Sequence, residues 1–203
     1  MKTKRILECT FNELATCGFK HVSVDNIAAK MHISKKTIYD MFENKEKLLL
    51  YSLKHKIGKI IEGFSPSLEK GNNALGTIIY NAVHLYKFFN SLSPQFWQEK
   101  GAYPLVEEYL NEFKEQLLQL GRKRFDQVKG EGYLRSDADF AIIGRLLESQ
   151  VMVMKEEIGC RQSDLSICFS CLVIIFRGVC TDRGIELLDN MVNAGFEMEV
   201  VEQ

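Results

Sequence analysis

The sequence lacks the signatures of the common enzyme classes. It contains no glycine-rich phosphate loop, no H-E-x-x-H pair and no G-x-S-x-G elbow. Its histidines, His21, His32, His55 and His84, are scattered along the chain, and no paired acid and base accompanies them. We therefore expect no catalytic residue, no metal ligand, no cofactor and no enzymatic activity.

A disulfide framework and a membrane-spanning run are also missing. Cys168 and Cys171 form a formal C-x-x-C pair, but they lie in an apolar segment, where cysteine is usually a small buried residue. Whether the pair has any redox role stays open. The longest apolar run, Ile167 to Phe176, contains Ser170 and is too short to cross a bilayer. Without a recognisable signal peptide, we expect a cytoplasmic protein with no membrane contact.

Charge is distributed unevenly along a chain whose net charge is only −1. Residues 1–60 hold 12 Lys or Arg and 6 Asp or Glu, a balance of +6, whereas residues 61–203 hold the other 14 and 21, a balance of −7. A basic N-terminal segment ahead of an acidic remainder indicates a polyanionic partner for the first segment.

The basic segment has the pattern of a helix-turn-helix. Ser23 can cap a helix over residues 24–31, and Ser34 can cap a second helix after a turn of about three residues. Ile38 and Phe42 form one apolar stripe on that second helix, which leaves Lys35 and Lys36 for other faces. A basic second helix of this kind suits the phosphate backbone of DNA.

From Arg5 to Leu49 the chain resembles, without gaps, the tetracycline-repressor (TetR) family of transcriptional regulators. The resemblance is carried by Arg5-Ile6-Leu7, Gly18-Phe19, Ser23-Val24, Ile27-Ala28, Ile33-Ser34-Lys35, Thr37-Ile38-Tyr39, Phe42 and Lys45-Glu46. It implies that Tyr39, Lys45 and Ser23 contact the DNA backbone. With the caps and lysines of the second helix, the expected DNA-binding residues are Ser23, Ser34, Lys35, Lys36, Thr37, Tyr39 and Lys45.

Three residues depart from the family pattern. His32 stands where the family usually has the glycine of the turn, and histidine tolerates a left-handed backbone better than most residues, so we expect strain there and not collapse. Lys36 replaces a frequent glycine and adds charge. Met41 replaces a frequent aromatic residue or histidine, so one phosphate contact of the family is not expected at this position.

The remainder of the chain reads as helices separated by Pro and Gly, with no segment of strand periodicity. We therefore predict an all-α protein: a three-helix DNA-binding domain over residues 1–46 and a helical ligand-binding and dimerisation domain over residues 47–203. The last two long helices are apolar around most of their circumference, which indicates burial on more than one side. We place Val151, Met154, Leu172 and Phe176 at a homodimer interface.

Bulky aromatic residues with polar tips are frequent in the second domain, where the resemblance implies a small-molecule pocket. We place the pocket among Tyr86, Trp97, Tyr109, Phe113 and Met152, and its mostly uncharged lining favours a flat, aromatic or apolar ligand. Ordinary core packing of these side chains is the alternative.

These observations predict a ligand-responsive homodimer that binds double-stranded operator DNA and, by resemblance, represses transcription until a small molecule releases it. Two alternatives remain. The same DNA-binding domain could serve an activator or a co-regulator, or the chain could be an all-α enzyme or carrier with a basic interaction surface.

Overall fold

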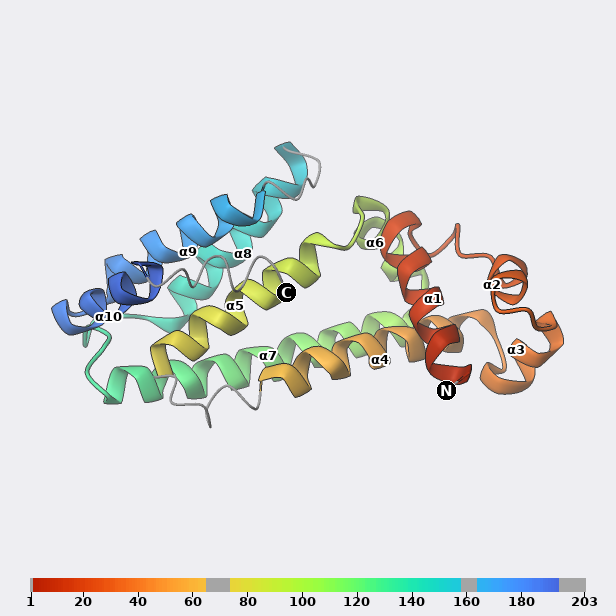
Figure 1. The fold of residues 1–203 in the computed structure, drawn as a ribbon, viewed down its shortest axis with the longest axis horizontal. Helices are drawn as coiled ribbons and strands as arrows, with labels where there is room; N and C mark the ends of the chain where they lie inside the picture. The colour runs from red at the N-terminus through yellow and green to blue at the C-terminus, as the bar shows by residue number, and fades with distance from the viewer. Residues whose placement is uncertain (1, 65–73, 158–163, 194–203) are drawn as a thin grey trace. The chain divides into compact units, whose positions relative to one another are not determined.

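The computed structural model describes residues 2–64, 74–157 and 164–193, and the side chains of residues 151–168 lie outside the description. The described residues form α-helices, one short 3-10 helix and an isolated bridge between Leu134 and Cys180, which confirms the all-α prediction (Figure 1). The helices are α1 Lys2–Cys17, α2 Val24–Lys30, α3 Lys35–Phe42, α4 Lys45–Phe64, α5 Ala74–Asn90, α6 Pro94–Glu99, η2 Lys100–Ala102, α7 Pro104–Gly130, α8 Phe140–Glu157, α9 Asp164–Val179 and α10 Asp182–Asn193. None of the helices in the described part of the chain has the length and apolar character needed to cross a membrane.

The chain forms two compact units that are not continuous in sequence. The first unit combines residues 1–63 with residues 91–116, so it holds α1–α4, α6, η2 and the first half of α7. The second unit combines residues 64–90 with residues 117–203. This division by packing has no boundary at residue 46. The boundary predicted there, between a DNA-binding domain and a ligand-binding and dimerisation domain, stays a prediction.

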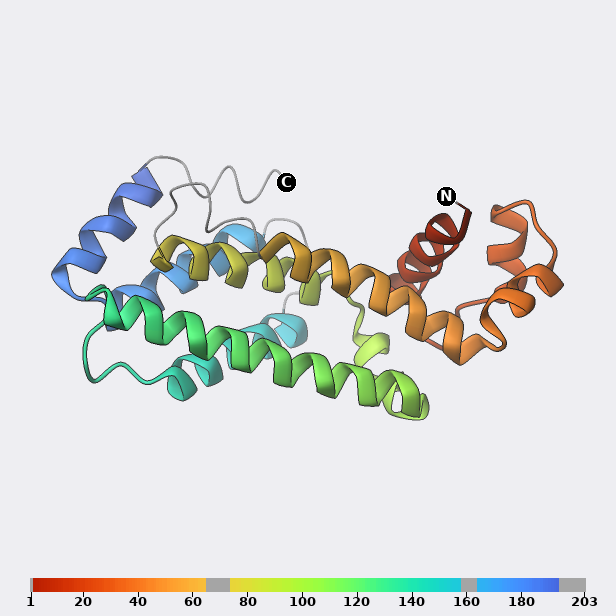
Figure 2. The ribbon, with the colours of Figure 1, turned by 90° about the horizontal axis from the view of Figure 1, so that it is seen from below.

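In the first unit, α1 contacts both α2 and α6, and α2 contacts α3. Figure 2 shows these N-terminal helices from below, with α4 leading away from α3. Ile6 and Leu14 of α1, Ile27 of α2 and Ile38 of α3 are fully buried. Burial of each such side chain stabilises the fold by about 1.5–3 kcal/mol, so the apolar stripes of these short helices hold them together.

A corner at Gly18 and Phe19 joins α1 to α6. Gly18 has a φ of +80°, a left-handed conformation that ends α1, and its N–H donates to the carbonyl of Leu14 at 3.0 Å. Phe19 is fully buried, with its ring centroid 4.9 Å from those of both Phe96 and Tyr103. The Ser93 N–H adds a bond to the carbonyl of Ala15 at 2.7 Å. Helix α1, which contacts α2, therefore also packs against α6.

In the second unit, α5 contacts α8, α9 and α10, and α10 also contacts α9. Helix α7 runs without interruption past Gly121. Gly121 makes room for a neighbour, because a Cβ at this position would lie 3.0 Å from Cζ of Phe140. Asp139 caps α8 by accepting from the Ala141 N–H at 2.7 Å.

Gly18→Ala should destabilise the protein by about 1–3 kcal/mol, because it places a side chain on a left-handed backbone. The new Cβ would also lie 2.8 Å from Cβ of Gln95 and 2.9 Å from Oε2 of Glu99. Chemical denaturation measures the loss. Gly58→Ala is the matched control: Gly58 lies inside α4, and a Cβ there would meet nothing within 4 Å, so alanine should be neutral or stabilise by up to about 1 kcal/mol. Equal losses in the two variants would contradict this account of the corner.

Candidate nucleic-acid interface

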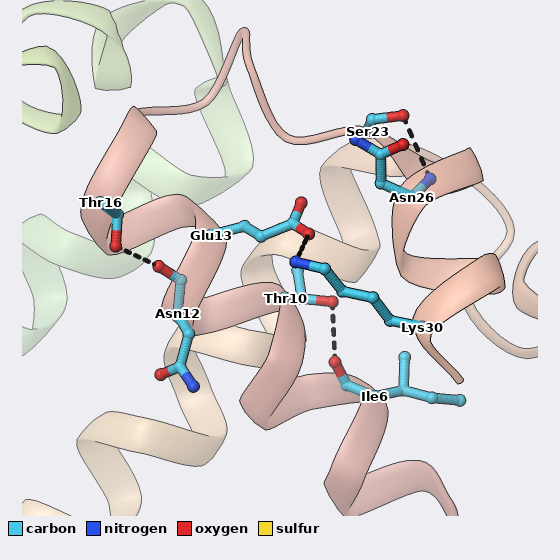
Figure 3. Close-up of polar contacts among 8 residues, drawn as sticks. All are labelled: Ile6, Thr10, Asn12, Glu13, Thr16, Ser23, Asn26 and Lys30. Atoms are coloured by element: carbon cyan, nitrogen blue, oxygen red, sulfur yellow. Dashed lines mark hydrogen bonds and ion pairs between the residues drawn. The ribbon is translucent and has the colours of Figure 1, made fainter. Parts of the chain in front are cut away.

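Helices α2 and α3 are joined by a short turn, and both are capped as the sequence predicts. The hydroxyl of Ser23 accepts from the Asn26 N–H at 3.3 Å and so satisfies a free amide of the first turn of α2 (Figure 3). The Ile33 N–H then donates to the carbonyl of Ala28 at 3.0 Å, which closes the turn. The result is a helix, a tight turn and a second helix with an exposed face, the arrangement of a helix-turn-helix.

His32 occupies the left-handed position of this turn, with a φ of 53°. Its N–H donates to the carbonyl of Ala29 at 3.1 Å, and its side chain is exposed. A left-handed conformation costs a non-glycine residue roughly 1–2 kcal/mol. The hydrogen bonds of the turn hold His32 in this strained conformation. Strain without collapse is what we expect where histidine replaces the usual glycine of the family.

Helix α3 is buried along one face and exposed along the other. Ile38 and Phe42 are buried, whereas Lys36, Tyr39 and Met41 are exposed. The hydroxyl of Ser34 accepts from the Thr37 N–H at 3.0 Å and lies 2.8 Å from the Thr37 hydroxyl. One predicted DNA-binding side chain, Ser34, therefore also caps the helix, and a second, Thr37, contacts that cap. The exposed side chains of α3 lie where a recognition helix presents residues to a major groove.

The two lysines at the start of α3 have different surroundings. The ammonium of Lys35 lies 2.9 Å from the Asp25 carboxylate of α2, and this hydrogen bond raises the pKa of Lys35. Among the described residues, no ion pair holds Lys36. Lys36 can thus approach a phosphate directly, whereas Lys35 must exchange Asp25 for the phosphate.

Lys45, at the start of α4, is half-buried. Its ammonium donates to the backbone carbonyl of Lys20 at 3.3 Å. Burial lowers the pKa of Lys45, and the nearby carboxylate of Glu99 opposes that shift. Lys45 is therefore a positioned cation and not a freely moving surface lysine.

The turn between α3 and α4 contains a feature that the sequence analysis missed. Glu43 has a φ of 64° and a ψ of −53°, and the Asn44 N–H donates to the carbonyl of Phe42 at 2.7 Å. These values are close to those of the rare, strained γ-turn. The side chain of Asn44 accepts from the Lys47 N–H at 2.9 Å and caps α4. An asparagine three residues before Lys47 was the available sequence signal for this cap.

An ion pair, which Figure 3 shows, joins α1 to α2. The Lys30 ammonium lies 2.8 Å from the Glu13 carboxylate. The buried hydroxyl of Thr10 donates to the carbonyl of Ile6 at 2.8 Å, within α1. An open cleft of about 530 Å³ runs along this junction, and Arg5, Glu8, Cys9, Asn12, Glu13, Thr16, Cys17, Lys30 and Met31 line it. Burial raises the pKa of the Cys9 thiol, which does not favour a reactive thiolate.

The predicted pocket residues fall in both units. Trp97, Tyr109 and Phe113 belong to the first unit, and Tyr86 belongs to the second. Tyr86 and Phe113 are buried, whereas Trp97 and Tyr109 are half-buried. The side chain of Met152 lies outside the described residues. A second open hollow, of about 820 Å³, lies on α7 and is lined by Pro104, Glu107, Glu108, Asn111, Glu112, Lys114 and Glu115. A pocket among the five predicted residues stays a prediction.

The predicted interface residues are also divided. Val151 and Met154 lie on α8, but their side chains are outside the described set. Leu172 and Phe176 are only 3% and 2% exposed, because they pack in the core of the second unit. Side chains that are buried within one chain have almost no surface left to cover with a partner. These two residues therefore do not face outwards on α9.

Comparisons with known proteins agree with this geometry. Residues 6–51 match the family model described as bacterial regulatory proteins, tetR family. No curated protein matches the sequence. The fold is similar to a transcriptional regulator from Saccharomonospora viridis solved in complex with choline, with a TM-score of 0.73 and 19% identity over 88% of this chain and 97% of that one.

Two further solved structures have the same fold. A TetR transcriptional regulator from Chloroflexus aurantiacus J-10-FL gives a TM-score of 0.69 and 17% identity, over 88% of this chain and 96% of that one. The ketosteroid transcriptional regulator KstR2 of Mycobacterium tuberculosis gives 0.66 and 17%, over 90% and 96%. The helix-turn-helix and these comparisons define a DNA-binding transcriptional regulator. Residues 6–51 carry the DNA-binding domain that the TetR family model describes, and the rest of the chain shares the fold of these regulators.

Lys36→Ala should lower the salt dependence of DNA binding, because each phosphate contact that is lost reduces the slope of log affinity against log salt by about one unit. Specific and non-specific affinity should fall together. Fluorescence anisotropy with a labelled duplex at several salt concentrations measures both. Lys123→Ala, an exposed lysine on the second half of α7, is the control and should leave the slope unchanged. An unchanged slope for Lys36→Ala would remove Lys36 from the interface.

Proposed function

We propose that the protein is a ligand-responsive transcriptional repressor that binds its operator as a homodimer and leaves it when a small molecule binds. One observation carries the proposal: residues 91–116 pack into the same compact unit as the helix-turn-helix. A ligand that moves α6 or the start of α7 must therefore act on the packing of the DNA-reading helices.

The direction of the effect follows from DNA geometry. Two recognition helices of a dimer read successive major grooves only when they lie about 34–36 Å apart. A ligand that favours a different spacing lowers operator affinity, by no more than its own difference in affinity for the two conformations. Release on ligand binding is the outcome when the liganded conformation has the wrong spacing.

Aromatic residues in the first unit support a ligand site there. The Trp97 ring lies 5.2 Å from that of Phe96, and the Lys54 ammonium lies 5.2 Å from the ring centroid of Tyr109. Burial raises the pKa of the Tyr109 hydroxyl, which stays neutral at physiological pH. Neutral aromatic rings accept a flat apolar compound. They also bind quaternary ammonium groups, and the regulator from Saccharomonospora viridis was solved with choline.

Exposed apolar side chains on α8 and α9 support the homodimer. Ile142 and Leu146 of α8 are 60% and 51% exposed, and Ile174 of α9 is 68% exposed. Large apolar residues gathered on two helices of one unit are typical of a surface that a partner covers. We propose that this surface, and not Leu172 or Phe176, makes the contact with the second subunit.

Transcription in vitro tests the regulatory role. An operator selected from random duplexes by the protein is placed over a promoter, and the transcript is measured with and without protein. A repressor lowers the transcript, and Lys36→Ala should restore it. A compound that relieves repression should also change the fluorescence of Trp97, since the chain has no other tryptophan. A transcript that rises when the operator lies upstream of the promoter would favour the activator. A protein that retards no duplex would favour the enzyme or carrier, although the related regulators argue against it.

Ile174→Glu should dissociate the homodimer, because it would bury a carboxylate without a partner in the contact. Sedimentation velocity should then report the mass of one chain. Leu118→Glu is the matched control, since Leu118 is also apolar and 41% exposed but lies on α7. Circular dichroism checks that both variants keep their helices. A folded Ile174→Glu variant with the mass of two chains would refute this interface.

A further inference from the structure

The backbone of Lys20 is held on both sides by charged groups from distant parts of the chain. Its N–H donates to Oε2 of Glu99, at the end of α6, over 2.9 Å. Its carbonyl accepts from the ammonium of Lys45, at the start of α4, over 3.3 Å. One residue of the α1–α2 connection thus joins an acidic side chain of α6 to a predicted phosphate contact.

The position of Glu99 is built into the corner and is not an accident of a surface side chain. Gly18 allows the carboxylate to approach, because a Cβ on Gly18 would lie 2.9 Å from Oε2 of Glu99. The rings of Phe19 and Phe96 pack against each other at the same corner, with centroids 4.9 Å apart. Hydrogen bonds from a backbone amide to a carboxylate are among the stronger ones in proteins. Glu99 is therefore fixed relative to Lys20.

A second carboxylate, on α4, makes a similar contact with the start of α7. Glu46 follows Lys45 on α4 and accepts from the Leu105 N–H over 2.9 Å, so it satisfies a free amide at the start of α7. The Tyr103 side chain lies near both carboxylates: burial raises its pKa most, and the charges of Glu99 and Glu46 raise it further. The start of α4 is thus tied to residues 99–105 through adjacent side chains.

We propose that Glu99 restrains Lys45 and thereby makes DNA affinity depend on the position of α6. The Lys45 ammonium is bonded to the Lys20 carbonyl and is attracted by the charge of Glu99, so it reaches a phosphate only against both. When α6 moves, the Lys20 backbone and the Lys45 side chain move with it. Glu99 is a positioning residue in this scheme, because it acts on DNA through Lys45. The inference rests on the proposed function, for which it supplies the regulated contact.

A double-mutant cycle on DNA binding tests the restraint. Glu99→Gln keeps an acceptor for the Lys20 N–H but removes the charge that attracts Lys45. Affinity for a 30-base-pair duplex selected by the wild-type protein should rise about threefold to fivefold, the range of an exposed charge–charge interaction. In the Lys45→Ala background the same change should have almost no effect, because the ammonium that Glu99 attracts is gone.

The control is Glu108→Gln on α7, which removes an exposed carboxylate and should leave affinity unchanged in both backgrounds. An unchanged or weaker affinity for Glu99→Gln would overturn the proposal. An equal rise in affinity when Glu99→Gln is added to Lys45→Ala would also overturn it, because that rise would be a general effect of the protein's charge on DNA binding. If the wild-type protein binds the duplex and represses transcription while the cycle is additive, the proposed function stands and the restraint alone fails.

Trp97 provides a second measurement that does not depend on the Glu99 variant. Saturating duplex should change Trp97 emission in the wild-type protein, because a site that controls DNA affinity must respond to DNA in return. Lys45→Ala, saturated at higher protein and DNA concentrations, should lose most of that change. No emission change in the wild-type protein, or an undiminished change in Lys45→Ala, would overturn the connection between Lys45 and α6.

Discussion

The burial of Phe19 between Phe96 and Tyr103 is the contact on which the arrangement of the first unit depends. The ring is fully buried, and both neighbouring ring centroids lie 4.9 Å away. Aromatic pairs at such distances contribute about 0.5–1.5 kcal/mol each beyond their area burial. Because Phe19 lies two residues after the end of α1, this contact determines where α6 lies against the DNA-binding helices. Apolar packing creates this core, and the hydrogen bonds of Glu99 and Glu46 restrict how its helices are oriented.

The predicted phosphate contacts are not equivalent, and the difference is electrostatic. Lys36 has an open approach, Lys35 is paired with Asp25, and Lys45 is half-buried against a backbone carbonyl. An exposed ion pair is worth about 1 kcal/mol or less, so Lys35 exchanges its partner at little cost. Lys45 would have to leave a position that burial and a hydrogen bond define. The lysine that is most firmly held is therefore the one through which the rest of the unit can influence binding.

The sequence predicted local features of this fold better than its packing. Ser23 and Ser34 cap α2 and α3 as predicted, because a helix cap depends on residues within one turn. The strained turn at Glu43 was missed, since nothing in the identity of a glutamate indicates a positive φ. Periodicity shows that an apolar helix is buried but not what covers it. Leu172 and Phe176 were therefore predicted at an interface, although they pack in the core of their own chain and Ile174 between them is exposed.

Regulation of DNA affinity in this fold requires little energy. Coupling between two sites in a protein is typically about 1–3 kcal/mol, and one hydrogen bond to a charged group contributes about 1.5–3 kcal/mol. The bonds of Glu99 to the Lys20 amide and of Glu46 to the Leu105 amide are of this kind but lie at the surface, where solvent reduces each to about 1 kcal/mol or less. A displacement of α6 that changes them would therefore alter DNA affinity by the lower end of a typical allosteric coupling. No unfolding of the helix-turn-helix is needed, because these bonds do not involve its buried side chains, among them Ile38.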